Sequence, residues 1–304
     1  MSFHLYFAGA GTKKYRKFMH ENNILRLLSY VNDKSAIEEW ISWGNKIFVD
    51  SGAYSAHTKG IDIDIDDYIN YVNERDDHVI ILAELDKIPG EFAKPKTMQQ
   101  LAEAPIISWE NYLYMRDRLK SPDKCLPIFH QGEDFYYLEQ MLSARFHGAP
   151  IPYIGISPAN DSVTKNKEKW LVSVFRHIKN SSNPNVLTHG FGITTLPVLE
   201  RIPLTSADSV KWVLNAAFGS IETPWGAITV SDKSTEKLHH IDYMPSQERE
   251  QIRKSVARFG YTIDQLREST HARAIHNIQY MQWWADHYQY KDVYDFTSKQ
   301  NTLF

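Results

Sequence analysis

The chain has little of what several classes of protein require. A single cysteine, Cys125, stands among its 304 residues. It therefore lacks the cysteines for a disulfide framework or for a zinc site built from several thiolates. No apolar run approaches the roughly 18 residues that would suggest a transmembrane helix. The first residues contain neither a basic segment nor a long apolar one, which predicts no secretory signal. These absences favour a cytoplasmic protein without a membrane partner.

The sequence also lacks an excess of charge of either sign. Its 34 Lys and Arg residues and 37 Asp and Glu residues give a formal net charge of -3, so it has no global attraction to nucleic acid. Basic residues cluster locally in three places: Lys13, Lys14, Arg16 and Lys17; Lys165, Lys167 and Lys169; and Arg253, Lys254 and Arg258. Such clusters are usually solvated helix faces, but together they would suit contacts with phosphates.

What the sequence does contain is an alternation of strand-like and helical patterns. Hydrophobic residues make up 42% of the chain and aromatic residues 13%, which is enough for one large core. Strands are predicted at 3–8, 24–31, 46–49, 78–85, 125–129, 153–157, 185–189 and 209–213. Helices are predicted between them at 12–21, 35–43, 65–75, 97–119, 135–145, 167–179 and 196–201. Eight such repeats favour an α/β fold of the (β/α)8 TIM-barrel type over an open sheet.

The pattern changes after the eighth predicted strand. Residues 220–230 contain Pro and Gly between apolar residues and predict a small inserted hairpin. Two helices are expected next, at 247–259 and 263–288, and the last residues show little periodicity. We therefore expect one domain over residues 1–290, with a C-terminal helical extension from about residue 246. Residues 291–304 would form a tail.

Two aspartates far apart in the sequence each look like a residue at the C-terminal end of a buried strand. Asp50 follows the run 46–49 and precedes a turn of small residues, and Asp208 lies in Ala207-Asp208-Ser209-Val210. The C-terminal ends of strands are where α/β enzymes hold catalytic groups. A pair of such carboxylates suggests one nucleophile and one acid/base. The alternative is that each aspartate merely caps the turn or helix that follows it.

Other predicted strands end in polar or glycine-containing strings. Asp86 and Gln131 offer a carboxylate and an amide, which together suit the hydrogen-bonding edge of a purine. Glycines at 155 and 190 would let a flat ligand approach the backbone closely. Tyr54 could supply a stacking face. The strings therefore predict a purine-binding site at one end of the barrel.

Taken in order, these strings resemble the tRNA-guanine transglycosylase (queuine/archaeosine tRNA-ribosyltransferase) superfamily, whose (β/α) barrels exchange guanine for a 7-deazaguanine. The resemblance covers most of residues 45–285 in short islands. The islands are Asp50-Ser51-Gly52-Ala53-Tyr54, Asp86, His130-Gln131-Gly132, Ile154-Gly155-Ile156-Ser157, His189-Gly190-Phe191-Gly192, Asp208-Ser209-Val210, Asn215-Ala216-Ala217-Phe218-Gly219, Trp225-Gly226 and His276-Asn277-Ile278-Gln279-Tyr280.

The resemblance implies a role for each matched residue. Asp208 would be the nucleophile that forms a covalent glycosyl-enzyme, and Asp50 the acid/base that handles the proton of the base. Asp86 and Gln131 would read the edge of the base, and Tyr54 would stack on one of its faces. The remaining implied substrate contacts are Gly132, the backbone of Gly155, Ile156 and Ser157, and, on the other face of the base, His189 with Gly190.

The sequence departs from the family pattern in three ways. His276 matches the histidine of the family's structural zinc site, but residues 235–245 contain no cysteine, so we expect no such zinc. Trp212-Val213-Leu214 stands where the family carries a Pro-Thr-Arg run after its nucleophile. We also expect no appended RNA-binding domain after the barrel. These departures make the chain most similar to the DNA-modifying, DpdA-type branch of phages and bacteria.

The resemblance therefore implies a DNA-guanine transglycosylase that inserts a 7-deazaguanine of the preQ0 type and needs no cofactor. Its partners would be DNA and the free base, with Lys13, Lys14, Lys165 and Lys167 near backbone phosphates. The alternatives are a tRNA-guanine transglycosylase and a non-catalytic nucleic-acid-binding subunit with the same barrel. A barrel enzyme acting on a sugar phosphate is disfavoured, because no Gly-rich phosphate-binding loop follows the last strands.

Overall fold

A computed structural model describes residues 3–159, 163–234 and 237–297 of the chain. The chain forms two compact units. The first unit comprises Met1–Ala10, Leu25–Asp208 and Gln289–Phe304. The second comprises Gly11–Ile24 and Ser209–Tyr288.

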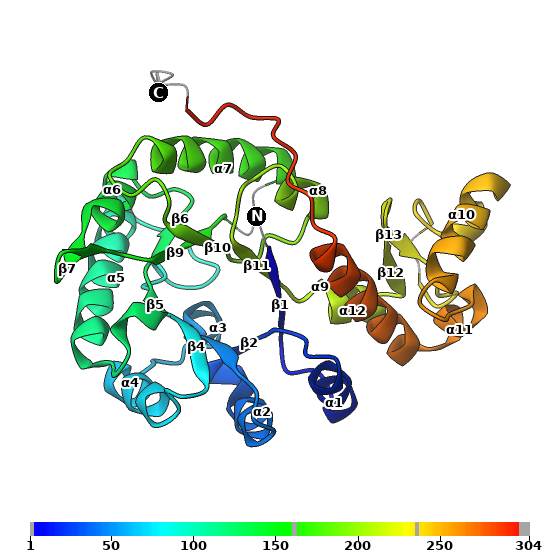
Figure 1. Cartoon of the computed structure of the whole chain (residues 1–304), viewed down its shortest axis with the longest axis horizontal. Helices are drawn as coiled ribbons and strands as arrows, with labels where there is room; N and C mark the ends of the chain where they lie inside the picture. The colour runs from blue at the N-terminus through cyan, green and yellow to red at the C-terminus, as the bar shows by residue number, and fades with distance from the viewer. Residues whose placement is uncertain (1–2, 160–162, 235–236, 298–304) are drawn as a thin grey trace. The chain divides into compact units, whose positions relative to one another are not determined.

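The first unit is built on a nine-stranded sheet in which the paired strands are parallel. The strands are β1 (His4–Ala8), β2 (Arg26–Ser29), β3 (Ile47–Asp50), β4 (Val79–Ala83), β5 (Cys125–Leu126), β6 (Ile128–His130), β9 (Tyr153–Ser157), β10 (Leu187–Gly190) and β11 (Ser206–Ser209). Their order across the sheet is β5-β4-β3-β2-β1-β11-β10-β9-β6. Figure 1 shows them arranged as a ring.

The two end strands of this sheet are consecutive in the sequence, since only Pro127 separates β5 from β6. Proline has no N–H to donate to a strand ladder. Its carbonyl nevertheless accepts from the Gly155 N–H at 2.8 Å, and the next N–H, of Ile128, donates to the Glu84 carboxyl at 2.6 Å. The sheet is therefore a nearly closed, barrel-like ring.

Helices surround this ring on its outer side (Figure 1). They are α2 (Tyr30–Ser42), α4 (Ile65–Glu74), α5 (Met98–Arg118), α6 (Phe135–Ser143), α7 (Thr164–Lys179) and the short α8 (Leu196–Leu199), while α3 (Ala53–Lys59) comes directly after β3 and Ser51-Gly52. The sequence predicted all of these except α3. That helix has seven residues and begins after Gly52, whose φ of 79° is left-handed, so its signal is a turn rather than an amphipathic period. A short hairpin of β7 (Arg145–Phe146) and β8 (Ala149–Pro150) was also missed.

Most predicted strands are confirmed within a few residues, but the eighth is wrong. The strand is β11, Ser206–Ser209, and residues Lys211–Ala217 form helix α9. The Ser209 hydroxyl accepts from the Lys211 N–H at 3.1 Å and thereby begins the helical turn. Trp212 and Ala216 are both buried at helical spacing. The apolar run was therefore too short to distinguish strand from helix by periodicity.

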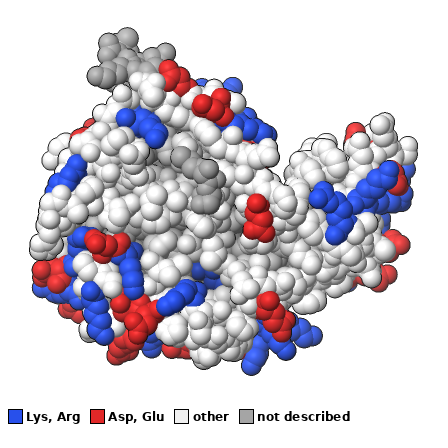
Figure 2. Space-filling model, in the orientation of Figure 1, with Lys and Arg blue, Asp and Glu red and all other residues white. Residues whose placement is uncertain are grey.

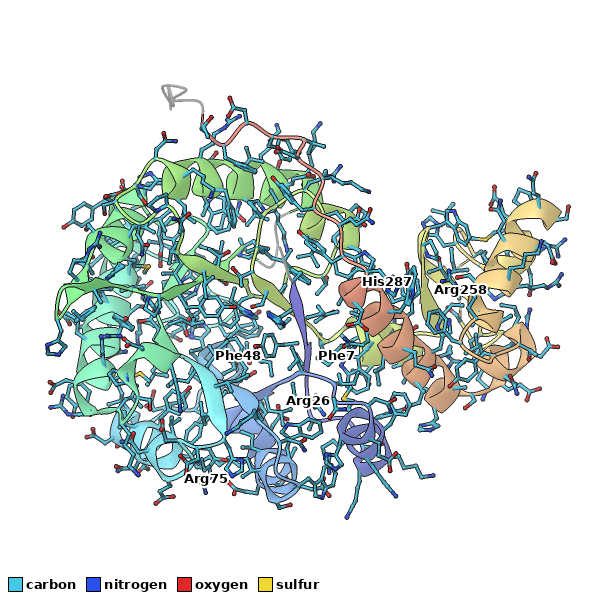
Figure 3. All side chains as sticks on the ribbon, viewed as in Figure 1. Phe7, Arg26, Phe48, Arg75, Arg258 and His287 are labelled. Atoms are coloured by element: carbon cyan, nitrogen blue, oxygen red, sulfur yellow. The ribbon has the colours of Figure 1, made fainter. Side chains whose placement is uncertain are left out.

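The interior of the ring is apolar near its middle. Tyr6, Leu27, Phe48, Leu126 and Ile128 form one buried cluster, with Ala83. Figure 3 labels Phe48 within the ring of strands. Neighbouring strands thus contribute bulky residues to a packed core, as the (β/α) alternation predicts.

The second unit combines helices with a two-stranded hairpin. Its elements are α1 (Lys13–Glu21), α9, β12 (Ser220–Thr223), β13 (Gly226–Thr229), the 3-10 turn η2 (Ile241–Tyr243), α10 (Ser246–Ala257), α11 (Ile263–Glu268) and α12 (Thr270–Asp286). The predicted hairpin is confirmed. The predicted helix 263–288 is instead two helices, because Ser269 is extended (φ -115°, ψ 112°) and caps α12 through a bond from the Ala272 N–H. No helix in the described parts of the chain is both long and apolar enough to span a bilayer.

The role of Glu84 in holding the ring together next to Pro127 can be tested through its pKa. Burial raises the pKa of its carboxyl well above the ordinary value, so the folded protein keeps a proton that the unfolded chain releases above pH ~4.3. The contribution of Glu84 to the free energy of unfolding should therefore fall as pH rises above that value. E84Q should show a smaller loss of stability between pH 5 and pH 8, measured by urea unfolding.

The matched variant E84A leaves the Ile128 N–H without its acceptor. It should be less stable than E84Q by about 1–3 kcal/mol, the cost of an unsatisfied buried donor. Equal pH dependence in the wild type and E84Q would contradict a protonated Glu84.

Candidate functional site

Three predicted aspartates meet at one end of the first unit. Asp50 ends β3, Asp208 lies in β11, and Asp86 follows β4 by three residues. The parallel strands bring their C-terminal ends to the same edge. The negative charges of Asp86 and Asp208 both act on the Asp50 carboxyl. The structure therefore brings together the three carboxylates that the sequence singled out.

Asp50 is positioned by the tight turn that follows its strand. Its register partner on β2 is Ser29, and its Oδ2 accepts from the Gly52 N–H at 3.1 Å. A Cβ on residue 52 would lie 2.5 Å from the Ser29 Oγ, so this turn requires glycine. Burial, followed by the charges of Asp86 and Asp208, raises the pKa of Asp50 to about 7. Asp50 can therefore both donate and accept a proton near neutral pH.

Asp208 is held through one of its two carboxylate oxygens. The Gly192 N–H donates to Oδ1 at 2.9 Å, and His189 Nε2 faces the same oxygen at 3.5 Å. Gly192 has a φ of 61°, a left-handed conformation that glycine adopts without strain. Within the described residues no hydrogen bond engages Oδ2. This oxygen is thus the one available for chemistry.

A buried string of polar groups leads away from Asp208. His189 is fully buried, its Nδ1 lies 2.5 Å from the Ser206 Oγ, and that hydroxyl lies 2.6 Å from the Tyr153 hydroxyl. Burial lowers the pKa of His189, although Asp208 opposes this shift. The imidazole is therefore neutral at pH 7. We call Tyr153, Ser206 and His189 the polar string.

The direction of the protons in the polar string follows from the charge at its end. If Tyr153 donates to Ser206 and Ser206 donates to Nδ1, the His189 proton sits on Nε2 and faces the Asp208 carboxylate. The reverse direction would place a bare nitrogen lone pair against that negative oxygen. The first arrangement is favoured, because the partner of one ring nitrogen sets the state of the other.

The ring of His189 is enclosed by aromatic side chains. Its centroid lies 4.7 Å from Phe48, 4.5 Å from Phe191 and 5.9 Å from Tyr6, all in edge-to-face arrangements. These contacts fix the plane of the imidazole. The sequence predicted that His189 stacks on one face of the bound base. Such stacking requires an accessible face of the imidazole, but the side chain is 0% exposed in this structure.

Asp86 belongs to a second charged group that the sequence analysis did not find. His130 Nε2 lies 3.0 Å from Asp86 Oδ2, and His130 Nδ1 lies 3.3 Å from Glu133 Oε1. Burial lowers the pKa of His130, but hydrogen bonds to Asp86 and Glu133 outweigh it and raise the pKa to about 10. An imidazolium thus stands between two carboxylates at neutral pH. The sequence signal that could have revealed this group is His130 at a strand end, followed three residues later by Glu133, with Gly132 between them.

Gln131 retains the donor that was predicted for it. Its Oε1 accepts from the Ala159 N–H at 3.0 Å, and its backbone N–H donates to the Ser157 carbonyl at 2.9 Å. Because the Ala159 N–H occupies Oε1, the side-chain NH2 points away from Ala159. Gly132, next along the chain, has a φ of 107° and open space where a Cβ would be.

Two of the predicted substrate-binding glycines make room for the protein itself. A Cβ on Gly155 would lie 2.6 Å from the Phe191 ring, and one on Gly190 would lie 2.7 Å from Ile193. Ile156 is fully buried. In this structure the space beside these glycines is taken by protein side chains, so any base contact there would be made by backbone groups alone.

The remaining predicted contacts are exposed to different degrees. Tyr54 lies in the first turn of α3 with 51% of its surface exposed. Lys165 is exposed and Lys167 half-buried near the start of α7 in the first unit. Lys13 and Lys14 begin α1 in the second unit and are exposed.

The second unit contains the residue matched to a zinc ligand, His276. Its ring is buried and lies 5.4 Å from Phe259, 5.8 Å from Tyr261 and 6.5 Å from Tyr280. Burial lowers its pKa to about 4. His276 is thus an aromatic packing residue here. Among the described residues one group has donor atoms close enough to share a metal ion, Asp232, His240 and Asp242, and Arg267 already pairs with both of its carboxylates.

No protein-family model matches this chain, and no curated protein matches it in sequence. The functional argument therefore rests on the geometry of the site and on the sequence of the strings at the strand ends.

The shared field of the three carboxylates can be tested without any substrate. D86N removes a negative charge that raises the Asp50 pKa, so Asp50 should titrate at a lower pH in that variant. D208N should act in the same direction. Carboxyl chemical shifts followed by NMR across pH 4–9 would measure both changes.

Asp33 supplies the matched control, because its charge is the weakest of the contributions to the Asp50 pKa. D33N should shift the Asp50 titration less than D86N does. An Asp50 pKa that stays at about 7 in D86N would show that the two carboxylates do not interact.

Proposed function

We propose that the first unit is a (β/α)8 barrel enzyme that exchanges guanine in DNA for a 7-deazaguanine base. The barrel count follows when β5 and β6 are taken as one strand interrupted by Pro127. The observation that carries the proposal is the presence of two different carboxyl groups at one site. Asp208 is held through one oxygen, and Asp50 has a pKa of about 7. The order of the strand-end strings, similar to that of tRNA-guanine transglycosylases, supports the choice of substrate.

The first half of the reaction breaks the glycosidic bond. Asp208 Oδ2 attacks the anomeric carbon, a C–O bond forms, and the C–N bond to guanine breaks through an oxocarbenium-like state. The electron pair of that bond goes to the departing base, which takes a proton from Asp50. The products are a covalent glycosyl-enzyme, neutral guanine and a deprotonated Asp50.

The second half reverses these steps with another base. The incoming 7-deazaguanine gives a proton to Asp50, its nitrogen attacks the anomeric carbon, and the bond to Asp208 breaks. The carboxylate is regenerated and the configuration is retained, because two displacements have occurred. The exchange reaction needs neither an oxidant nor a nucleoside triphosphate. Asp50 must be protonated in one half and ionised in the other, which a pKa of about 7 allows.

The proposed base pocket is formed by strand-end residues of the first unit. Asp86 would accept from the ring N–H or exocyclic amine, and the Gln131 NH2 would donate to the carbonyl. Tyr54, half-exposed on α3, would stack on the base. A guanine within a duplex must be extruded from the stack to reach such a pocket. The reaction would take place in the cytoplasm, where both DNA and free base are accessible.

DNA is favoured over tRNA as the substrate by two features of the sequence. Trp212-Val213-Leu214 replaces the family's Pro-Thr-Arg run, and these residues lie in helix α9. Within residues 3–159, 163–234 and 237–297 we identify no module for 2′-hydroxyl recognition. The runner-up functions are exchange in tRNA and a non-catalytic nucleic-acid-binding subunit. The non-catalytic subunit is disfavoured, because nucleic-acid binding alone does not require an Asp50 whose pKa is about 7.

Incorporation of labelled guanine or 7-deazaguanine into matched DNA and tRNA substrates tests the proposal. The wild type should label DNA. D208N should abolish labelling while nucleic-acid binding stays within about threefold, because the carboxylate acts on the bond and not on the phosphates. Denaturing gels should reveal a covalent DNA adduct only when Asp208 is present.

The outcomes separate the candidate functions. Labelling of tRNA alone would identify the runner-up substrate. Binding without labelling of either nucleic acid would favour the non-catalytic subunit. Undiminished labelling by D208N would overturn the assignment of the nucleophile.

The polar string should act as a positioning device for Asp208. Removing the Ser206 hydroxyl leaves His189 Nδ1 without its partner, so the Nε2 proton is no longer fixed toward Asp208. We expect S206A to lower kcat about tenfold, on the scale of a lost hydrogen bond, with little change in KM. The 15N shifts of His189 should change at the same time.

Y153F removes the outer hydroxyl of the string and should have a smaller effect in the same direction. Y6F is its matched control, since Tyr6 packs against the same imidazole but lies outside the string. Equal losses in Y153F and Y6F, with unchanged His189 shifts, would mean that these residues support the barrel and do not position Asp208.

A further inference from the structure

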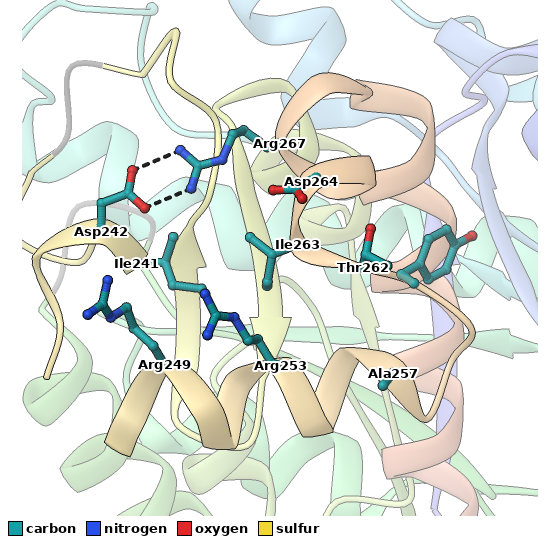
Figure 4. A pocket seen from close by; sticks show the side chains of 10 residues that line it. Ile241, Asp242, Arg249, Arg253, Ala257, Thr262, Ile263, Asp264 and Arg267 are labelled. Carbon is teal, nitrogen blue, oxygen red and sulfur yellow. Dashed lines mark hydrogen bonds and ion pairs between the residues drawn. The ribbon is translucent and has the colours of Figure 1, made fainter. Parts of the chain in front are cut away.

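The second unit contains a cavity of about 330 Å³ that the proposed exchange reaction does not use. It lies between the helix α10, the turn η2 and the short helix α11, as Figure 4 shows. Apolar side chains, Ile241 and Ile263, form part of its wall. Arginines supply its positive charge: Arg249 and Arg253 from α10, and Arg267 from α11.

One of these arginines is already paired. Arg267 donates to both oxygens of Asp242, at 2.7 Å and 2.8 Å, and also pairs with Asp232. Figure 4 marks the two bonds to Asp242. The hydrogen bonds from Arg267 are the main reason that the pKa of Asp242 is lowered. Arg267 therefore largely neutralises the negative charge of Asp242.

The other two arginines lack a comparable partner. Arg249 and Arg253 are four residues apart on α10 and so share one face of the helix. Arg253 is 60% exposed, and Glu250 lies 3.8 Å from its guanidinium. The Nε of Arg249 is buried with no hydrogen-bond partner among the described residues. A buried donor without an acceptor is costly, and here it lies beside an open cavity.

We propose that this cavity binds a phosphate group through Arg249 and Arg253. A guanidinium offers a planar fork of N–H donors that matches phosphate oxygens, and an ionised acceptor gives the strongest such bonds. A phosphate oxygen would also satisfy the buried Arg249 Nε. The residues that line the cavity include three arginines and two carboxylates, Asp242 and Asp264. Asp232 and Glu250 approach Arg267 and Arg253 from outside this lining, so Arg249 is the guanidinium with the least compensation.

The surrounding surface favours the same class of ligand. Figure 2 shows Lys and Arg side chains gathered over the region of α10. The sequence places Lys254 and Arg258 on or just after this helix, beside Arg253. The phosphate could belong to a nucleic-acid backbone or to a small phosphorylated compound. Both present the same tetrahedral anion to the two arginines.

The site is separate from the proposed exchange site, since the residues that line the cavity belong to the second unit and Asp50, Asp86 and Asp208 belong to the first. Its test is therefore a binding measurement on the whole chain. The variants are R249Q and R253Q. The matched control is K254Q, which removes the same charge from the same helix at a position that does not line the cavity.

The first measurement is thermal unfolding with inorganic phosphate, against sodium chloride of equal ionic strength. A ligand that binds only the folded state raises Tm with its concentration. Phosphate should raise Tm in the wild type and K254Q, and the rise should be at most half as large in R249Q and R253Q. Equal rises in all four proteins, or no rise in the wild type, would overturn the proposal.

The second measurement distinguishes the two sources of phosphate. Binding of a duplex oligonucleotide and of a mononucleotide is compared across the same proteins at several salt concentrations. A backbone site predicts about tenfold weaker oligonucleotide binding in either arginine variant, with a salt slope reduced by about 1. A small-molecule site predicts a loss of mononucleotide binding with unchanged oligonucleotide affinity. Losses in K254Q as large as in R253Q would show general surface charge and refute a built site.

Discussion

Repulsion between carboxylates at one end of the strand ring is the constraint on which the first unit depends. Asp50, Asp86 and Asp208 are brought together by parallel strands, and the charges of Asp86 and Asp208 both oppose the ionisation of Asp50. Like charges that share a site cannot all remain ionised without compensation. The surrounding structure supplies that compensation separately for each carboxylate.

The compensation differs between the three carboxylates. Asp86 is paired with the imidazolium of His130. Asp208 is stabilised by the Gly192 N–H and faces the His189 ring. Asp50 receives one backbone N–H, and burial with the two neighbouring charges keeps its pKa at about 7. Environments that separate the protonation of neighbouring carboxyl groups are typical of acid/base pairs. The proposed reaction uses this separation directly.

The sequence predicted the parts of the site that follow from strand ends. Asp50 and Asp86 follow apolar runs, so their placement at one edge requires only parallel strands. The polar string could not be predicted, because it depends on register. Ser206 meets His189 since β10 and β11 pair these residues, and Tyr153 reaches them from another strand. Gly155 was interpreted as ligand access, yet its missing Cβ makes room for Phe191, a contact that no local pattern encodes.

The second unit is built around a small apolar core. Its core of Ile221, Ile228, Val230, Ile252 and Leu266, with further apolar residues, joins the hairpin to α10 and α11. Arg267 adds ion pairs to Asp242 and Asp232, whose side chains are 45% and 65% exposed. Pairs this exposed contribute at most about 1 kcal/mol, so burial of the core stabilises the unit. The Nε of Arg249 is buried without a hydrogen-bond partner among the described residues, so an acceptor from outside the chain, such as the proposed phosphate, would satisfy it.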